Sequence, residues 1–102
     1  MYDLLIKNGL VYDGKGGEAF IADVAVKGEK ISKIGKIEEE AKKVIDANGK
    51  IVTPGFVDIH THFDGQVTWD PYLRSSTYHG VTTIVTGNCG VGFSPCKPEQ
   101  RD

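Results

Sequence analysis

The sequence predicts an α/β fold in which a small β unit, residues 1–53, precedes a strand–helix–strand unit, residues 54–102. Short apolar segments separated by turn dipeptides fill the first half, as is typical of antiparallel sheets. After a Thr-Pro-Gly join at residues 53–55, two strand-like runs flank one helix-like segment, which is the pattern of a parallel βαβ unit. The two halves are therefore expected to form separate structural regions.

The N-terminal segment predicts a β-hairpin. Residues 4–7 and 10–12 are largely apolar and lie on either side of Asn8-Gly9. The Asn-Gly dipeptide is typical of two-residue hairpin turns because both turn residues must adopt a positive φ. We therefore expect two antiparallel strands that meet at this dipeptide.

The rest of the first half continues as a small antiparallel β unit. Residues 22–27 alternate in the manner of a half-buried strand, and Gly28-Glu29 turns the chain into a further segment, residues 30–35. The charged stretch 36–43 is either a solvated connection or a short helix. Two last strand candidates flank Asn48-Gly49. About 50 residues bury little apolar surface, so this unit has a thin core for a domain standing alone.

The second half reads as one strand, one helix and one strand. Residues 56–63 begin as an apolar strand, and the β-branched run 81–86 suits a parallel strand that is covered on both faces. A helix over residues 71–79 is predicted by Asp70 as its N-cap and Gly80 as its C-terminal stop. We expect the crossover to be right-handed.

The composition excludes several classes of partner. With 12 basic and 14 acidic residues in 102, the net charge of −2 gives no electrostatic case for nucleic acid or an anionic membrane. The apolar runs are too short for a transmembrane helix, and the first residues lack the layout of a signal peptide. We expect a soluble, cytoplasmic protein that acts on a small molecule; a homo-oligomer is compatible with the sequence.

The stretch PGFVDIHTHFDG, residues 54–65, sets ionisable side chains at every second position of a strand. Successive strand residues point to opposite faces, so Asp58, His60, His62 and Asp64 share one face, and the other is mainly apolar. Two imidazoles on one face can converge on a cation about 2 Å from each nitrogen. The C-terminal end of a strand is also where barrel active sites lie. The pattern therefore predicts a metal site at the two histidines.

A simpler interpretation remains open, in which His60 and His62 are core or surface histidines bonded to Asp58 and Asp64. The apolar start of the strand, the position at its end and the flanking aspartates favour the metal site. Asp58, deeper on the same face, would then accept a hydrogen bond from a ligand histidine and orient its ring. Asp64 would order the ligands or contact the substrate.

Cys89 follows the second strand, inside the sequence TGNCG. Because the C-terminal ends of neighbouring parallel strands meet at one edge, Cys89 is expected beside the two histidines, and a thiolate with two imidazoles suits zinc. The alternative is that Cys89 is a small buried hydrophobe. We interpret Cys96, in a loop, as incidental, and His79 as structural or a helix cap. Both cysteines are expected to be free thiols in a reducing compartment.

Together these motifs resemble a known family. A small β unit followed by GFVDIHTHFDG resembles the amidohydrolase superfamily of metal-dependent hydrolases, and HGVTTIVTGNCGVGFSP resembles its N-acyl-D-amino-acid deacylase (D-aminoacylase) branch. The first motif is shared by many branches. Gly-Asn-Cys-Gly is more specific, because other branches use a carboxylated lysine from a later strand. The resemblance covers essentially the whole sequence, which corresponds to the opening of a much longer family chain.

The resemblance implies a (β/α)8, TIM-type barrel with a small β-sandwich built from both chain ends. Residues 1–53 would be the N-terminal part of the sandwich, and residues 54–102 the first two barrel strands. His60 and His62 would correspond to the first-strand metal ligands and Cys89 to the cysteine ligand of zinc. Two further histidines and a general-base aspartate would lie in later strands, outside this sequence.

The function implied by the resemblance is a zinc-dependent hydrolase of linear amides that deacylates N-acyl-D-amino acids, with residues 1–102 alone inactive. One alternative is a cyclic-amide hydrolase of the hydantoinase or dihydroorotase type, against which Asn88-Cys89-Gly90 argues. Another is a non-catalytic amidohydrolase-like scaffold. Such scaffolds typically lose their metal histidines, and this sequence retains both.

Overall fold

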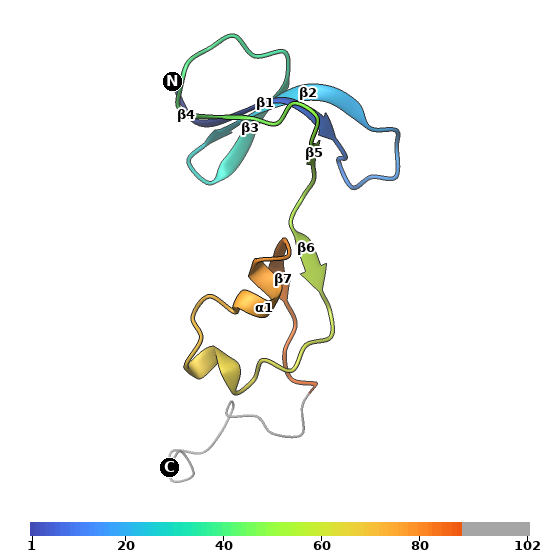
Figure 1. The fold of residues 1–102 in the computed structure, drawn as a ribbon, viewed down its shortest axis with the longest axis vertical. Helices are drawn as coiled ribbons and strands as arrows, with labels where there is room; N and C mark the ends of the chain where they lie inside the picture. The colour runs from blue at the N-terminus through green and yellow to red at the C-terminus, as the bar shows by residue number, and fades with distance from the viewer. Residues whose placement is uncertain (89–102) are drawn as a thin grey trace. The chain divides into compact units, whose positions relative to one another are not determined.

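A computed structural model gives the structure of residues 1–88. The chain divides into two compact units, the first spanning Met1–Pro54 and the second beginning at Gly55 (Figure 1). Within residues 1–88, no helix has the length and apolar character needed to cross a membrane.

The first unit is a five-stranded mixed sheet in the order β3-β2-β1-β4, with β5 also paired to β1 (Figure 1). Its strands are β1 (Tyr2–Val11), β2 (Phe20–Lys27), β3 (Lys30–Gly35), β4 (Ala41–Asp46) and β5 (Ile51–Val52). β2 is antiparallel to both β1 and β3, whereas β4 and β5 run parallel to β1. The expectation of a purely antiparallel unit is therefore wrong. The reason is that the chain after β3 crosses to the far side of β1 instead of turning back beside β3.

The predicted hairpin at Asn8-Gly9 is also wrong. β1 runs through this dipeptide without turning, and its pairing with β2 shifts between Ile6 and Gly9, which marks a β-bulge. Asn8 has the positive φ expected of a turn residue, 63°, but this conformation forms part of the bulge and does not reverse the chain. Gly9 is required by packing, because a Cβ there would collide with the side chain of Val52.

Two other predicted turns are confirmed. Gly28, between β2 and β3, has a φ of 60°, and Gly49, between β4 and β5, has a φ of 78°. The second of these does not make a hairpin, because the strands on either side both pair with β1.

The core of this unit lies on both faces of β2. Leu5, Ala25 and Ile37 form one buried cluster, and Val11, Ala22 and Val24 form another. Ile37 is fully buried although its neighbours in the charged stretch are exposed. The stretch is neither helical nor wholly solvated, because Ile37 packs against Leu5 and Ala25 and residues 41–43 belong to β4.

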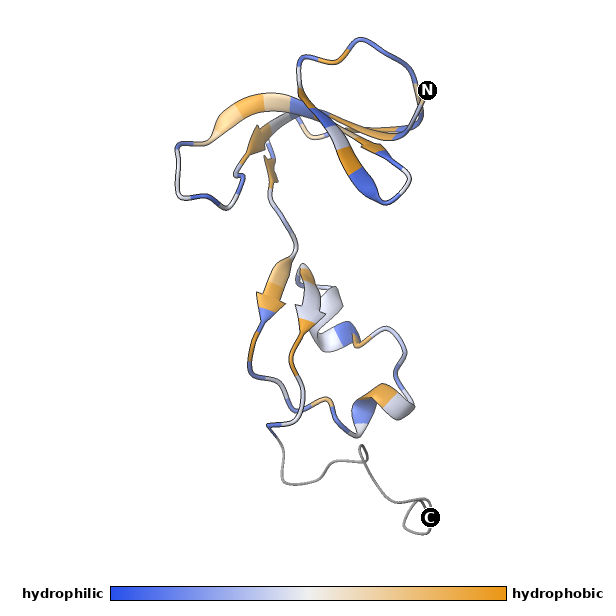
Figure 2. Cartoon of the chain, turned by 180° about the vertical axis from the view of Figure 1, so that it is seen from behind, coloured by the Kyte–Doolittle hydropathy of each residue, from blue (hydrophilic) through white to orange (hydrophobic). Residues whose placement is uncertain are grey.

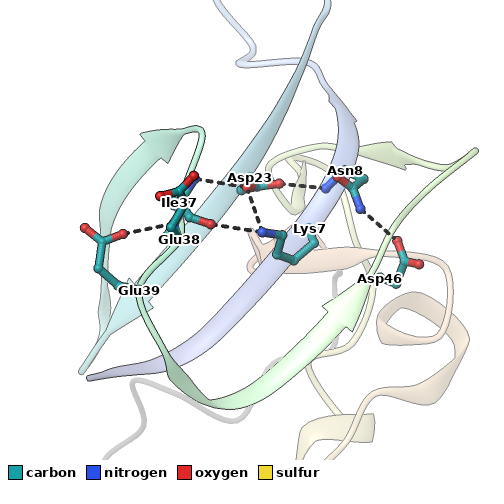
Figure 3. A network of polar contacts seen from close by, with 7 residues as sticks. All are labelled: Lys7, Asn8, Asp23, Ile37, Glu38, Glu39 and Asp46. Carbon is teal, nitrogen blue, oxygen red and sulfur yellow. Dashed lines mark hydrogen bonds and ion pairs between the residues drawn. The ribbon is translucent and has the colours of Figure 1, made fainter.

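A buried polar network joins three segments of this unit (Figure 3). Asp23, only 5% exposed, accepts hydrogen bonds from the backbone amides of Asn8 at 2.8 Å and Ile37 at 3.0 Å. Its carboxylate also pairs with the Lys7 ammonium at 3.4 Å, and this ammonium donates to the Ile37 carbonyl oxygen at 2.9 Å. Asn8 reaches Asp46 through its side chain. The network fixes the crossing segment to β1 and β2.

The second unit contains β6 (Phe56–Asp58), the 3-10 helix η1 (Gln66–Thr68), α1 (Arg74–Thr77) and β7 (Val81–Ile84). β6 and β7 pair in parallel and α1 packs against β7, so the strand–helix–strand prediction is confirmed. All three elements are shorter than predicted. Asp70 is not the N-cap, which is Leu73, but its carboxylate still accepts from the backbone amide of Arg74 at 3.2 Å. Gly80 ends the helical turn at a φ of 89°, as expected.

Among the described residues, the apolar side chains of β6 and of the residue after it have no core within the second unit. Val57 is 59% exposed and Ile59 is 75% exposed. Figure 2 shows the apolar character that runs along β6. The mainly apolar face of the predicted strand therefore has no packed core against Val57 and Ile59 within residues 1–88.

Candidate metal site

His60 and His62 lie in the loop that leaves the C-terminal end of β6. The strand ends at Asp58, earlier than predicted, so both histidines follow the strand instead of belonging to it. Their ring centroids lie 5.2 Å apart, with the ring planes tilted by 47°. Both residues are exposed, whereas Thr61 between them is 5% exposed. The loop therefore presents two neighbouring imidazoles and buries the residue between them.

The separation of the two rings fits a shared zinc ion. Two imidazoles bound to one tetrahedral zinc through nitrogens about 2.0–2.1 Å from the metal have ring centroids about 5 Å apart. Within residues 1–88, however, no three His, Cys, Asp or Glu residues gather closely enough to hold a metal. This part of the chain thus brings together two imidazoles, fewer donors than a zinc site needs. The predicted third ligand, Cys89, and the other cysteine, Cys96, lie outside the described residues.

Hydrogen bonds to the end of β7 hold the histidine loop in place. The backbone amide of Val85 donates to the carbonyl oxygen of Asp58 at 2.9 Å, which extends the pairing of β6 with β7 by one step. The Val85 carbonyl then accepts from both the amide and the hydroxyl of Thr61, at 3.3 and 2.8 Å. These bonds explain why Thr61 is buried and the histidines on either side of it face outward.

Both aspartates of the motif bond to backbone amides. Asp58 accepts from the amide of His60 at 3.1 Å, which bends the chain out of the strand. Asp64 accepts from the amide of Gly87 at 2.9 Å through Oδ2, and its buried Oδ1 has no partner among the described residues. The simpler interpretation paired these carboxylates with the imidazoles. Their recorded bonds instead shape the backbone around the rings.

The segment between the histidine loop and α1 is organised by Asp70, a role that the sequence did not predict. Its carboxylate accepts from the Gln66 side-chain amide at 3.1 Å and from the backbone amides of Tyr72 and Arg74. Burial alone would raise the pKa of Asp70, but these hydrogen bonds outweigh burial and hold the pKa below its ordinary value. His79 lies in the turn after α1, with its backbone amide bonded to Ser76.

Comparison with known proteins gives one family. A family model described as the amidohydrolase family matches residues 43–101. An N-acyl-D-glutamate deacylase of Alcaligenes xylosoxydans xylosoxydans is 44% identical over 94 residues, which are 91% of this chain and 19% of that protein. An allantoinase of Salmonella choleraesuis is 46% identical over 89 residues, which are 82% of this chain and 19% of that protein.

A solved structure resembles nearly the whole chain. It is the crystal structure of N-acyl-D-glutamate deacylase from Bordetella bronchiseptica complexed with zinc and a phosphonate inhibitor. It matches 97% of this chain and 21% of its own, with a TM-score of 0.88 and 40% sequence identity. The strand-rich fold with a small helical part thus recurs in that enzyme. The chain spans about a fifth of the length of each of these relatives.

Proposed function

Because the chain belongs to the amidohydrolase family, we propose that the protein containing it is a zinc-dependent hydrolase that deacylates N-acyl-D-amino acids. The observation that carries the proposal is the pair of imidazole rings of His60 and His62, 5.2 Å apart at the C-terminal end of β6. The similarity of almost the whole chain to N-acyl-D-glutamate deacylases supports the substrate class.

The proposal includes the architecture of the whole protein. Residues 1–53 would form the N-terminal part of a small β-sandwich, and residues 54–102 the first two strands of a (β/α)8 barrel. The parallel pairing of β6 with β7 supports this assignment, as does the exposure of Val57 and Ile59, which further strands and helices would cover. The histidine loop would then lie at the barrel end that holds active sites in this fold.

The ligands of the proposed zinc ion are His60, His62 and Cys89. When bound, zinc supplies Lewis-acid polarisation of the substrate carbonyl and a water of lowered pKa. The two imidazoles must offer neutral nitrogens and Cys89 a thiolate. Asp58 and Thr61 hold the loop that carries the imidazoles, through the Asp58–His60 and Thr61–Val85 hydrogen bonds.

The general base is proposed to lie outside residues 1–102. A general base must reach the proton that it moves, and it needs a free carboxylate oxygen for that purpose. Asp58 uses Oδ1 to accept from the amide of His60 and so shapes the loop, and the free oxygen of Asp64 is buried. An aspartate from a later strand, as in the family, would carry the proton to the leaving amine.

The test is hydrolysis by the full-length zinc-loaded protein of N-acetyl-D-glutamate, with N-acetyl-L-glutamate as the stereochemical control. We expect release of acetate from the D compound alone. His60→Asn and His62→Asn should each remove most of the bound zinc and lower turnover by at least about 100-fold. His79→Asn, which changes an exposed histidine in the turn after α1, should leave both unchanged. Equal hydrolysis of the two enantiomers would refute the substrate class.

A second candidate, hydrolysis of a cyclic amide, is favoured by the allantoinase, which is 46% identical. The allantoinase matches a smaller share of this chain than the N-acyl-D-glutamate deacylase does. In the same assay, turnover of allantoin without release of acetate would replace the deacylase proposal. Zinc binding without hydrolysis of either compound would favour the non-catalytic scaffold.

A further inference from the structure

Side-chain hydrogen bonds tie the histidine loop to the chain that leaves β7. Thr61, between the histidines, donates its hydroxyl to the Val85 carbonyl at 2.8 Å. Asp64, two residues after His62, accepts from the backbone amide of Gly87 at 2.9 Å. The two bonds bridge the same pair of segments in succession, and the second lies where backbone pairing between β6 and β7 has ended.

The Asp64–Gly87 bond depends on local features of both residues. Gly87 has a φ of 95°, a conformation that L side chains rarely adopt, and nothing in residues 1–88 lies within 4 Å of the position that a Cβ would take. The backbone conformation by itself therefore favours glycine at this position. Asp64 keeps its second oxygen buried without a partner in residues 1–88. A buried carboxylate oxygen without a hydrogen bond is costly, so the placement of this side chain needs a compensating role.

We propose that Asp64 is a positioning residue of the metal site, which holds the segment leading to Cys89 against the loop that carries His60 and His62. The inference rests on the proposed function, because that function makes these three residues ligands. Asp64 is two residues from His62, and Gly87 is two residues from Cys89. A ligand set drawn from two loops must be held to within about 0.5 Å, which requires supporting bonds between the loops. The Asp64–Gly87 bond is such a support.

Two other roles for Asp64 predict different behaviour. If Asp64 only stabilised the fold, its loss would lower the thermal unfolding temperature without changing zinc affinity. If Asp64 were itself a ligand, an asparagine would be a poor substitute, because it lacks the negative charge. A positioning residue needs only an acceptor for the Gly87 amide, which the carbonyl oxygen of an asparagine also offers.

The experiment compares Asp64→Ala and Asp64→Asn in the full-length protein. Asp13→Ala is the matched control, because Asp13 is an exposed aspartate whose Oδ1 accepts from the backbone amide of Lys15 at 2.8 Å. Zinc affinity is measured by competition with a chelator, and hydrogen–deuterium exchange is followed in peptides that contain Gly87. Neither measurement requires a substrate.

We expect Asp64→Ala to weaken zinc binding by about 10- to 100-fold and to accelerate exchange around Gly87. Asp64→Asn should restore both to near wild type, and Asp13→Ala should change neither. Unchanged exchange in Asp64→Ala would show that the Asp64–Gly87 bond does not hold the two segments together. Unchanged zinc affinity in Asp64→Ala would overturn the positioning role, and so would an Asp64→Asn variant as defective as Asp64→Ala. A wild-type protein that binds zinc but hydrolyses neither N-acetyl-D-glutamate nor allantoin refutes the proposed function and leaves the positioning role of Asp64 standing. A wild-type protein that binds no zinc refutes both.

Discussion

The carboxylate of Asp23 accepts a hydrogen bond from the backbone amide of Asn8 at 2.8 Å and thereby holds the β-bulge of β1 in place. The same carboxylate accepts from the amide of Ile37, which lies in the segment that crosses from β3 to β4. A single buried side chain on β2 therefore fixes both the bulge of β1 and the segment that crosses from β3 to β4.

Asp23→Ala should destabilise the first unit by about 1–3 kcal/mol, because it leaves the Asn8 and Ile37 amides without their acceptor. The measurement is hydrogen–deuterium exchange of peptides from residues 1–54 in the full-length protein, with Asp13→Ala as the exposed control. Exchange as slow in Asp23→Ala as in the control would contradict this role.

The stability of the first unit should depend on pH through Asp23. The hydrogen bonds from the amides of Asn8 and Ile37, with a smaller contribution from Lys7, hold the pKa of Asp23 below its ordinary value of 3.8. A depressed folded-state pKa adds stability above the unfolded-state pKa, and that stability is lost as the pH falls through the folded-state pKa. Exchange measured from pH 5 down to about pH 3 should show this loss in the wild type and much less of it in Asp23→Asn.

Gly55→Ala should disrupt the start of β6. A Cβ at position 55 would collide with the side chain of Thr82, including its Cβ, which cannot rotate away. Overpacking of this kind costs about 1–3 kcal/mol, so the thermal unfolding temperature of the full-length protein should fall. Gly17→Ala is the matched control, because no described residue lies within 4 Å of a Cβ there and the position has no positive φ. Equal unfolding temperatures for the two variants would refute the clash.

The two cysteines should differ in their effect on bound metal. Under the proposed function, Cys89→Ala removes tightly bound zinc and nearly all turnover, whereas Cys96→Ala leaves both close to wild type. If Cys89 were a core residue, its replacement would cost about 1 kcal/mol of stability and spare the metal. Zinc quantified by mass spectrometry in the two purified variants distinguishes these outcomes, and full occupancy in Cys89→Ala would rule out its role as a ligand.

Residues 1–102 expressed alone should be catalytically inactive. A closed barrel takes about 250 residues, and the exposed side chains of Val57 and Ile59 indicate apolar surface that other parts of the protein would cover. Acetate release from N-acetyl-D-glutamate by the purified 102-residue chain is the measurement. Turnover comparable with that of the full-length protein would show that the further strands and helices of the proposed barrel are dispensable.

The parallel unit was predictable because its signals are local and agree with one another. The β-branched run before Gly87, the apolar start at Phe56 and the stop at Gly80 all specify one strand–helix–strand order. The lengths were overestimated because Asp58 turns the chain at His60 and Asp70 organises the segment before α1. Hydrogen bonds from a side chain to the backbone do not alter the periodic pattern of apolar residues from which strands and helices are predicted.

The topology of the first unit was not predictable in the same way. An Asn-Gly dipeptide indicates a positive φ but not whether the chain turns or forms a bulge there. Asn8 lies in a bulge. The parallel partners of β1 are decided by where the crossing segment packs. Ile37, a lone apolar residue among charged neighbours, was the one local signal of that crossing. The burial of Asp23 had no sequence signal, since the alternation of residues 22–27 sets it on the strand face opposite Ala22 and Val24.

The parallel pairing of β1 with β4 and β5 also has a consequence for synthesis on the ribosome. Tyr2 pairs with Ala41, and Val11 with Val52, so β1 emerges roughly 2–8 s before its last partners at 5–20 residues per second. Until β4 emerges, the nascent chain can form only the antiparallel β1-β2-β3 meander, with one edge of β1 open to other nascent chains. We expect chaperone contacts to concentrate on this edge until β4 and β5 have left the exit tunnel.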